Sequence, residues 1–230
     1  MCFPPAGGFL AARSNLTQRV LAAAAFGPLL LALFWVGGLP LLAGLWVVVG
    51  AGTLEYYWMQ EQKGLQPWAW FGVSASLAWC VWFHFLGPGS LLFLLLGLVL
   101  LVLIVAILHG GPALRLADAW ATLAGALYVG FLGSFALLVR NFSKAGVSEG
   151  ESPELAVLVL VGIWTADTAA YFFGRAFGRR HPFPNISPGK TGAGCVGSLV
   201  GPLLVVLAGA CVLDVLSVAE GVALGLVVGV

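Results

Sequence analysis

The chain has 230 residues, of which 61% are hydrophobic and only 8% are charged, and its formal net charge is +1. A soluble domain carries about 25% charged residues, so the composition excludes a water-soluble globular domain, a disordered chain and a nucleic-acid binder with a basic face. We therefore expect an all-α protein that forms a polytopic bundle of transmembrane helices.

Long apolar runs follow one another along the chain. A helix rises about 1.5 Å per residue and needs roughly 20 apolar residues to cross the hydrocarbon core of a bilayer. Gly37 and Gly38 lie between the first two runs and suit a tight helical hairpin. We expect seven complete spans and the start of an eighth near residue 219; the complete spans lie near residues 20–37, 39–58, 68–86, 90–109, 119–139, 154–174 and 193–213.

The two ends of the chain need separate interpretation. Arg13 and Arg19 precede the first apolar run, as in a secretory signal, but a second run follows without a polar mature segment, so we favour a retained helix. The last run covers 11 residues from Glu220 to Val230, about 16 Å of helix, which is too short to span a bilayer. We expect residues 1–230 to form a single integral membrane domain that lacks its C-terminal part, as a fragment or a truncated chain.

Positive charge in the short loops predicts the orientation. Loops rich in Lys and Arg face the cytoplasm in most membrane proteins. With the N-terminus inside, eight of the ten Lys and Arg residues lie on the cytoplasmic side, and only Arg140 and Lys144 lie outside. We therefore expect residues 1–18 and the loop around Lys190 to be cytoplasmic, in a protein of a bacterial inner membrane.

Residues 164–194 form a polar segment unlike the rest of the chain. Asp167 lies inside an apolar span, where a carboxylate costs a few kcal/mol unless it faces a cavity, a partner or a metal. Tyr171 and Arg175 follow at spacings of four residues and share its helix face. Two plainer interpretations stay open: Asp167 pairs with a polar group on another helix, and Arg175 and Arg179 only anchor lipid headgroups.

A short turn from Ser187 to Thr191 carries hydroxyl groups and a cation into a glycine-rich stretch. Small residues let backbone N–H groups approach a phosphate, and Lys190 adds a point charge. The turn is not a Walker A loop, because the first glycine of that pattern is missing. Beside Asp167 and the arginines, it indicates a membrane-surface site for an anionic, phosphate-bearing substrate.

These residues resemble the phosphatidate cytidylyltransferase (CDP-diacylglycerol synthase) family. Ala193 stands where the family usually has a glutamate, and Gly192 stands where it usually has a tryptophan. The acidic signature of the family lies further along and is not present before Val230. The positions that match in order and spacing are Asp167-Thr168-Ala169-Ala170-Tyr171, Gly174-Arg175, Phe177-Gly178-Arg179, Ile186-Ser187-Pro188, Lys190-Thr191 and Gly194.

The resemblance implies a nucleotidyl transfer in phospholipid biosynthesis. The phosphate of phosphatidate attacks the α-phosphate of CTP and displaces pyrophosphate, which yields CDP-diacylglycerol, with Mg²⁺ as cofactor. Asp167 and Lys190 are the implied catalytic residues, and Asp167 is a metal ligand whose companions lie beyond Val230. The implied partners are phosphatidate, CTP and membrane lipids, without nucleic acid, and a homodimer is the candidate assembly. The implied substrate-binding residues are Arg175, Arg179, Ser187, Thr191 and Tyr171.

Three alternatives stay open. A truncated or degenerate relative would lack activity, and we expect residues 1–230 alone to be inactive because the acidic signature is absent. A CTP-dependent polyprenol or phytol kinase would share the membrane setting, but the Asp-Thr-Ala-Ala-Tyr pattern favours the cytidylyltransferases. A transporter would show interrupted helices in both halves of the chain, whereas the polar residues here are concentrated in one segment.

Overall fold

A computed structural model describes residues 24, 26–89, 91–109, 116–142, 153–182, 187 and 189–229. These residues form helices and short connections without a strand, so the all-α prediction is confirmed for the described part of the chain. The predicted cytoplasmic segment 1–18, and Ile186 and Pro188 of the family pattern, lie outside the described residues.

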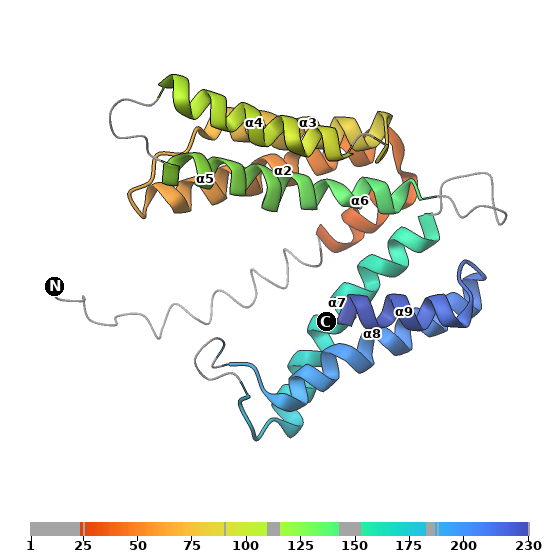
Figure 1. Cartoon of the computed structure of the whole chain (residues 1–230). Helices are drawn as coiled ribbons and strands as arrows, with labels where there is room; N and C mark the ends of the chain where they lie inside the picture. Colours follow the sequence, from red (N-terminus) through yellow and green to blue (C-terminus); the bar gives the residue numbers. More distant parts are fainter. Residues whose placement is uncertain are drawn as a thin grey trace.

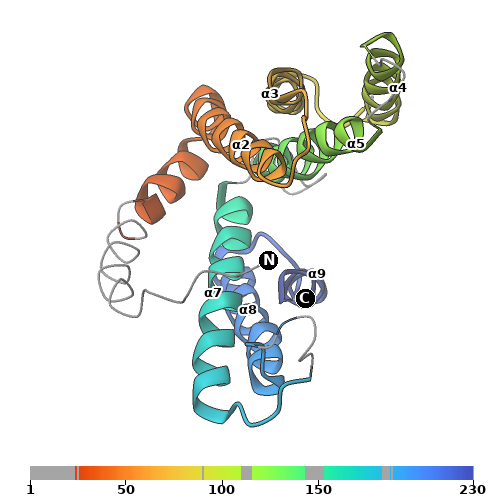
Figure 2. The same cartoon turned by 90° about the vertical axis from the view of Figure 1, so that its left-hand side faces the viewer.

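The helices form two groups (Figures 1 and 2). The first group contains a helix over residues 26–36 and the elements up to Arg140, and the second contains the three helices that follow. The elements are α2 (Gly38–Glu61), α3 (Ala69–Phe85), α4 (Leu91–His109), α5 (Leu116–Ala124), the π-helix η1 (Gly125–Phe131), α6 (Leu132–Arg140), α7 (Pro153–Phe177), α8 (Gly192–Leu213) and α9 (Val218–Gly229).

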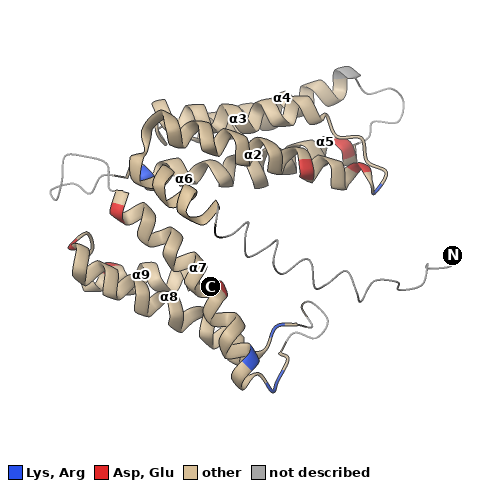
Figure 3. Ribbon diagram, turned by 180° about the vertical axis from the view of Figure 1, so that it is seen from behind, with Lys and Arg blue, Asp and Glu red and all other residues tan. Residues whose placement is uncertain are grey.

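The helices agree with a membrane bundle. Four of them are long and apolar enough to cross a bilayer: α2, the continuous segment Leu116–Arg140, α7 and α8. Shorter apolar helices cover the remaining predicted runs, at Phe26–Val36, Ala69–Phe85, Leu91–Ile107 and Val218–Gly229. Most charged residues of the described part lie toward helix ends (Figure 3). Asp167, in the interior of α7, is an exception. The chain is thus an integral membrane protein, and the count of seven spans stays a prediction.

The chain turns at Gly37, where φ is +68°, as expected for the predicted hairpin. Leu33 of the first helix lies over Gly44 of α2, because a Cβ at position 44 would be 2.7 Å from its Cδ1 atom. Arg140 at the end of α6 is 4% exposed, and its guanidinium donates to the carbonyl oxygens of Phe34 and of Trp35. This cation therefore caps the C-terminal end of the first helix, where a positive charge is favourable.

A hydrogen-bond network ties the other end of this group together. The backbone N–H of Gln66, in the connection after α2, donates to Oδ1 of Asp118 at 2.7 Å. Trp68 donates its backbone N–H to the hydroxyl of Thr122 at 2.9 Å, and the phenol of Tyr57 donates to the carbonyl of Thr122 at 2.7 Å. Buried polar groups need such partners, so the network holds α2, α3 and α5 in one arrangement.

Glycines bring α7 and α8 into close contact along the half of α7 that carries the polar segment. A Cβ at Gly197 would lie 2.7 Å from the carbonyl oxygen of Ala169, and one at Gly201 would lie 2.6 Å from the Cβ of Ala169. Gly174 faces Gly194 at the start of α8. Small residues let membrane helices approach at backbone distance, so this contact fixes how the polar face of α7 sits against α8.

Pro202 is buried inside α8 and interrupts its hydrogen-bond ladder. Proline has no N–H, so the carbonyl of Ser198, four residues earlier, has no helical donor. Gly229 of α9 packs against this carbonyl, since a Cβ at position 229 would lie 2.7 Å from its oxygen. α9 therefore approaches α8 closely at the interruption.

Gly197 and Gly97 offer a matched test of this packing. Gly197→Ala should lower the stability by about 1–3 kcal/mol, because the new methyl group must push backbone apart. Gly97→Ala should be neutral or stabilising by up to about 1 kcal/mol, because a Cβ at Gly97 of α4 meets nothing within 4 Å. Thermal unfolding of both variants in detergent measures the difference, and equal midpoints would contradict the close contact.

Candidate functional site

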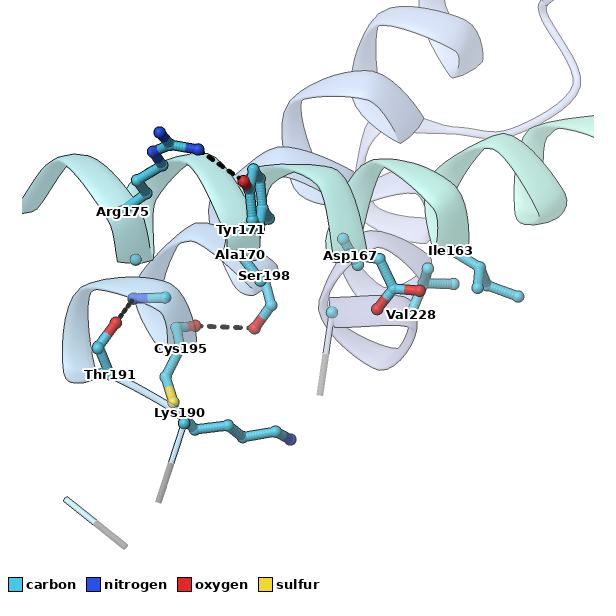
Figure 4. A pocket seen from close by; sticks show the side chains of 15 residues that line it. Ile163, Asp167, Ala170, Tyr171, Arg175, Lys190, Thr191, Cys195, Ser198 and Val228 are labelled. Carbon is cyan, nitrogen blue, oxygen red and sulfur yellow. Dashed lines mark hydrogen bonds between the residues drawn. The ribbon is translucent and has the colours of Figure 1, made fainter. Parts of the chain in front are cut away.

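An open cavity of about 570 Å³ lies where the second half of α7, the start of α8 and the end of α9 meet. Figure 4 shows the side chains that line it. Three of them carry charge: Asp167 and Arg175 from α7, and Lys190 from the turn before α8. Two further cavities among the described residues are lined by no Lys, Arg, Asp or Glu.

One wall of the cavity is a single face of α7. Asp167, Tyr171 and Arg175 all line it, as their spacing of four residues predicts. The guanidinium of Arg175 donates from Nη1 to the phenol oxygen of Tyr171 at 2.8 Å, along the helix (Figure 4). Val228 of α9 lines the same cavity as Asp167 (Figure 4). The sequence pattern therefore becomes a wall with a carboxylate at one end and a cation at the other.

The opposite wall begins with the turn of Lys190 and Thr191. Thr191 is the N-cap of α8, and its hydroxyl accepts a hydrogen bond from the backbone N–H of Gly194 at 3.1 Å. The carbonyl of Arg180 accepts from the N–H of Gly192 at 2.9 Å, which ties the turn to the chain after α7. A helix N-terminus carries partial positive charge, so Lys190 and the start of α8 together favour an anion in the cavity.

The glycines explain why the turn can lie so close to α7. A Cβ at Gly174 would be 3.0 Å from the hydroxyl oxygen of Thr191, and a Cβ at Gly178 would be 2.8 Å from the same atom. Any larger residue at these two positions would push Thr191 and the cation beside it away from α7. The glycines of the family pattern therefore position the cationic turn.

Five of the seven predicted site residues line the cavity: Asp167, Tyr171, Arg175, Lys190 and Thr191. Arg179 is exposed in the segment after α7, and Ser187 is half-buried in the turn; neither lines the cavity. The roles of all seven in substrate binding or catalysis stay predictions.

Sequence reasoning missed two polar residues of the cavity, Cys195 and Ser198 of α8. The hydroxyl of Ser198 donates to the carbonyl of Cys195 at 2.9 Å. They follow Thr191 at four and seven residues and share its helix face, but the sequence does not show that this face of α8 turns toward α7. Ala193 and Gly192, where the chain departs from the family pattern, do not line the cavity, so neither departure removes a lining side chain.

The arrangement suits a ligand that carries phosphate. In the described part of the chain, Asp167 forms no ion pair with Lys190 or Arg175, so these charges are available to a ligand. No cluster of three His, Cys, Asp or Glu residues that could hold a metal occurs among the described residues. Mg²⁺ often uses one or two carboxylates together with substrate phosphates, and the single carboxylate of Asp167 is compatible with that mode.

Residues 17–230 match the family described as the Cytidylyltransferase family. The chain is 28% identical over 206 residues to the phosphatidate cytidylyltransferase of Brucella suis biovar 1 (strain 1330). The aligned region covers 84% of this chain and 68% of the relative. It is 36% identical over 118 residues to the phosphatidate cytidylyltransferase of Pseudomonas aeruginosa, covering 43% of this chain and 44% of the relative. A third relative, the phosphatidate cytidylyltransferase of Haemophilus influenzae, is 46% identical over 50 residues, which are 22% of this chain and 17% of the relative.

Cys195 gives a direct test of the cavity. A charged methanethiosulfonate reagent should modify Cys195 in protein whose Cys2 and Cys211 are replaced by Ser, because thiols react as thiolates and need access to water. Cys80 is fully buried and should not react. Mass spectrometry of the labelled protein gives the site, and Cys195→Ser in the same background is the control. Modification only after unfolding would contradict an open, hydrated cavity.

Proposed function

Because this chain belongs to the cytidylyltransferase family, we propose that it transfers the cytidylyl group of CTP to phosphatidate. The products are CDP-diacylglycerol, a precursor of phospholipids, and pyrophosphate. The observation that carries this proposal is the meeting of Asp167, Arg175 and Lys190 at one cavity, beside the N-terminus of α8. The named function of the relatives supports the same reaction.

The proposed reaction is a displacement at phosphorus. An oxygen of the phosphatidate phosphate attacks the α-phosphorus of CTP, a new P–O bond forms, and the bond to the bridging oxygen breaks so that pyrophosphate leaves with the electron pair. Such transfers depend on positioning and on neutralising negative charge. Lys190 and the N-terminus of α8 would hold the triphosphate, and Arg175, aligned by Tyr171, would contact the phosphate of the lipid.

Other parts of the site enter the proposal with supporting roles. Thr191 would donate a hydrogen bond to a phosphate oxygen while its own oxygen caps α8. Arg179 and Ser187 would contact the bound substrates from outside the cavity lining. Mg²⁺, when bound, would neutralise phosphate charge, and Asp167 would be the ligand for it in this part of the chain.

The setting of the reaction follows from the two substrates. CTP is dissolved in the cytoplasm and phosphatidate is held in the bilayer, so the cavity would face the cytoplasm from an inner membrane. The N-terminus would lie on the same side. We further propose that residues 1–230 belong to one membrane domain and that the protein acts as a homodimer.

Substitution of the carboxylate tests the proposal most directly. Asp167→Asn in the complete gene product should lower CDP-lipid formation at least about 100-fold, because the neutral amide cannot balance cationic charge or hold a metal. Membranes are assayed with labelled CTP and phosphatidate, and the lipid products are separated. Asp214→Asn is the matched control, because Asp214 is exposed at the far end of α8. Full activity of Asp167→Asn would exclude the site, and a phosphorylated lipid without cytidine would indicate a kinase instead.

The cation of the turn should act on nucleotide binding. Lys190→Ala should raise KM for CTP about 10-fold or more, since a charge-assisted hydrogen bond contributes about 1.5–3 kcal/mol. Arg180→Ala removes a neighbouring exposed cation that does not line the cavity, and its KM should change little. Initial rates at varied CTP give both values. Equal KM values for the two variants would contradict the role of Lys190 in holding the triphosphate.

A further inference from the structure

A second, mostly apolar cavity of about 680 Å³ lies between the two groups of helices. Its walls include Phe135 of α6, Leu155 and Val159 of α7, and Leu224 of α9. The cavity lined by Asp167, Arg175 and Lys190, which we call the charged cavity, is bordered by α7 from Ile163 to Arg175. The apolar cavity is bordered by the first two turns of the same helix. The apolar cavity, which we call the distal cavity, therefore lies toward the opposite end of the bundle.

Two polar side chains border the distal cavity. His84 lies in the last turn of α3, and Asn141 follows α6 directly. The Nδ1 atom of His84 is buried and has no hydrogen-bond partner in the described part of the chain. The ring of His84 packs edge-on against Phe85, with centroids 4.6 Å apart. A buried ring nitrogen is stabilised by a hydrogen bond, and a rotation of the His84 side chain that brings Nδ1 to the cavity would let a polar ligand atom supply it.

The position of these polar groups matches the level at which a membrane span ends. His84 and Asn141 lie at the ends of apolar helices. The rest of the cavity lining is apolar and includes Phe135, Leu138 and Val159. In an integral membrane protein, an apolar hollow takes up hydrocarbon chains more readily than water, because water there would lose its hydrogen bonds. The volume lies in the range of cavities that bind small molecules.

We propose that the distal cavity binds one glycerophospholipid from the leaflet opposite the charged cavity. The ester and phosphate oxygens of the lipid lie near His84 and Asn141, and an acyl chain runs between α6, α7 and α9. α6 packs on α7 where the two groups meet, and the bound lipid adds a further contact between the groups. This binding does not depend on the reaction proposed above.

Filling the cavity is the first arm of the test. The full chain is released from mild detergent in a native mass spectrometer, with phosphatidylglycerol as the added lipid. Wild-type protein should retain one phospholipid per chain, and Leu224→Trp should reduce its occupancy at least fivefold by occupying the cavity. Val227→Trp is the matched control, because Val227 lies on the same helix, is 76% exposed and does not line the cavity.

The second arm tests where the lipid binds and whether its binding needs a polar side chain at position 84. A phosphatidylglycerol with a diazirine in its acyl chain should crosslink to wild-type peptides that contain Leu155 and Val159. His84→Phe should lower the crosslinking at least threefold, whereas His84→Gln, which keeps a polar group, should retain most of it. Crosslinks spread evenly over all exposed helices, or equal lipid occupancy in the two Trp variants, would overturn the proposal. Crosslinks between two protein chains at these peptides would do so as well, because a second copy would then fill the cavity.

If Leu224→Trp does not fold, Val159→Phe fills the same cavity with a smaller change. The thermal midpoint and the size-exclusion profile identify that outcome. The wild-type crosslinking result decides the location of the lipid without any variant, so the proposal stays open to contradiction in either case. Because both arms measure lipid binding alone, their failure is distinct from failure of the nucleotidyl transfer.

Discussion

The close contact between α7 and α8 is the constraint on which the charged cavity depends. At Gly197 and Gly201 the two helices meet at backbone distance, so their relative rotation and height are restricted far more than in a contact between long side chains. Gly174 and Gly178 then admit Thr191 against the end of α7. One contact thus places the N-terminus of α8 and Lys190 opposite the polar face of α7.

The charged groups of this cavity come from two different elements that hold them apart. Asp167 and Arg175 are fixed along a helix, and Arg175 is further aligned by its hydrogen bond to Tyr171. Lys190 comes from a turn that is tied by the cap of Thr191. Charges held on such elements need little rearrangement when a ligand arrives, and that preorganisation is what stabilises charge developing in a reaction.

Sequence periodicity predicts which residues of α7 line the charged cavity, but it does not predict the lining residues of α8. Asp167, Tyr171 and Arg175 stand out because they are polar in an apolar run, and a spacing of four residues places them on one side. Cys195 and Ser198 carry no such contrast, since the rotation of α8 is set by glycines whose partners on α7 are unknown before folding. The role of Arg140 was equally hidden: the carbonyls of the first helix lie more than a hundred residues earlier in the chain. The apolar runs predicted the helices themselves, but length alone does not establish how many of them cross the membrane.

The interruption of α8 at Pro202 limits which residue α9 can carry at position 229. The Ser198 carbonyl has no donor within its own helix, and a Cβ at Gly229 would lie 2.7 Å from its oxygen. A side chain at position 229 would therefore separate the end of α9 from α8. Because Ser198 and Gly229 both line the charged cavity, that separation would also change the shape of this wall.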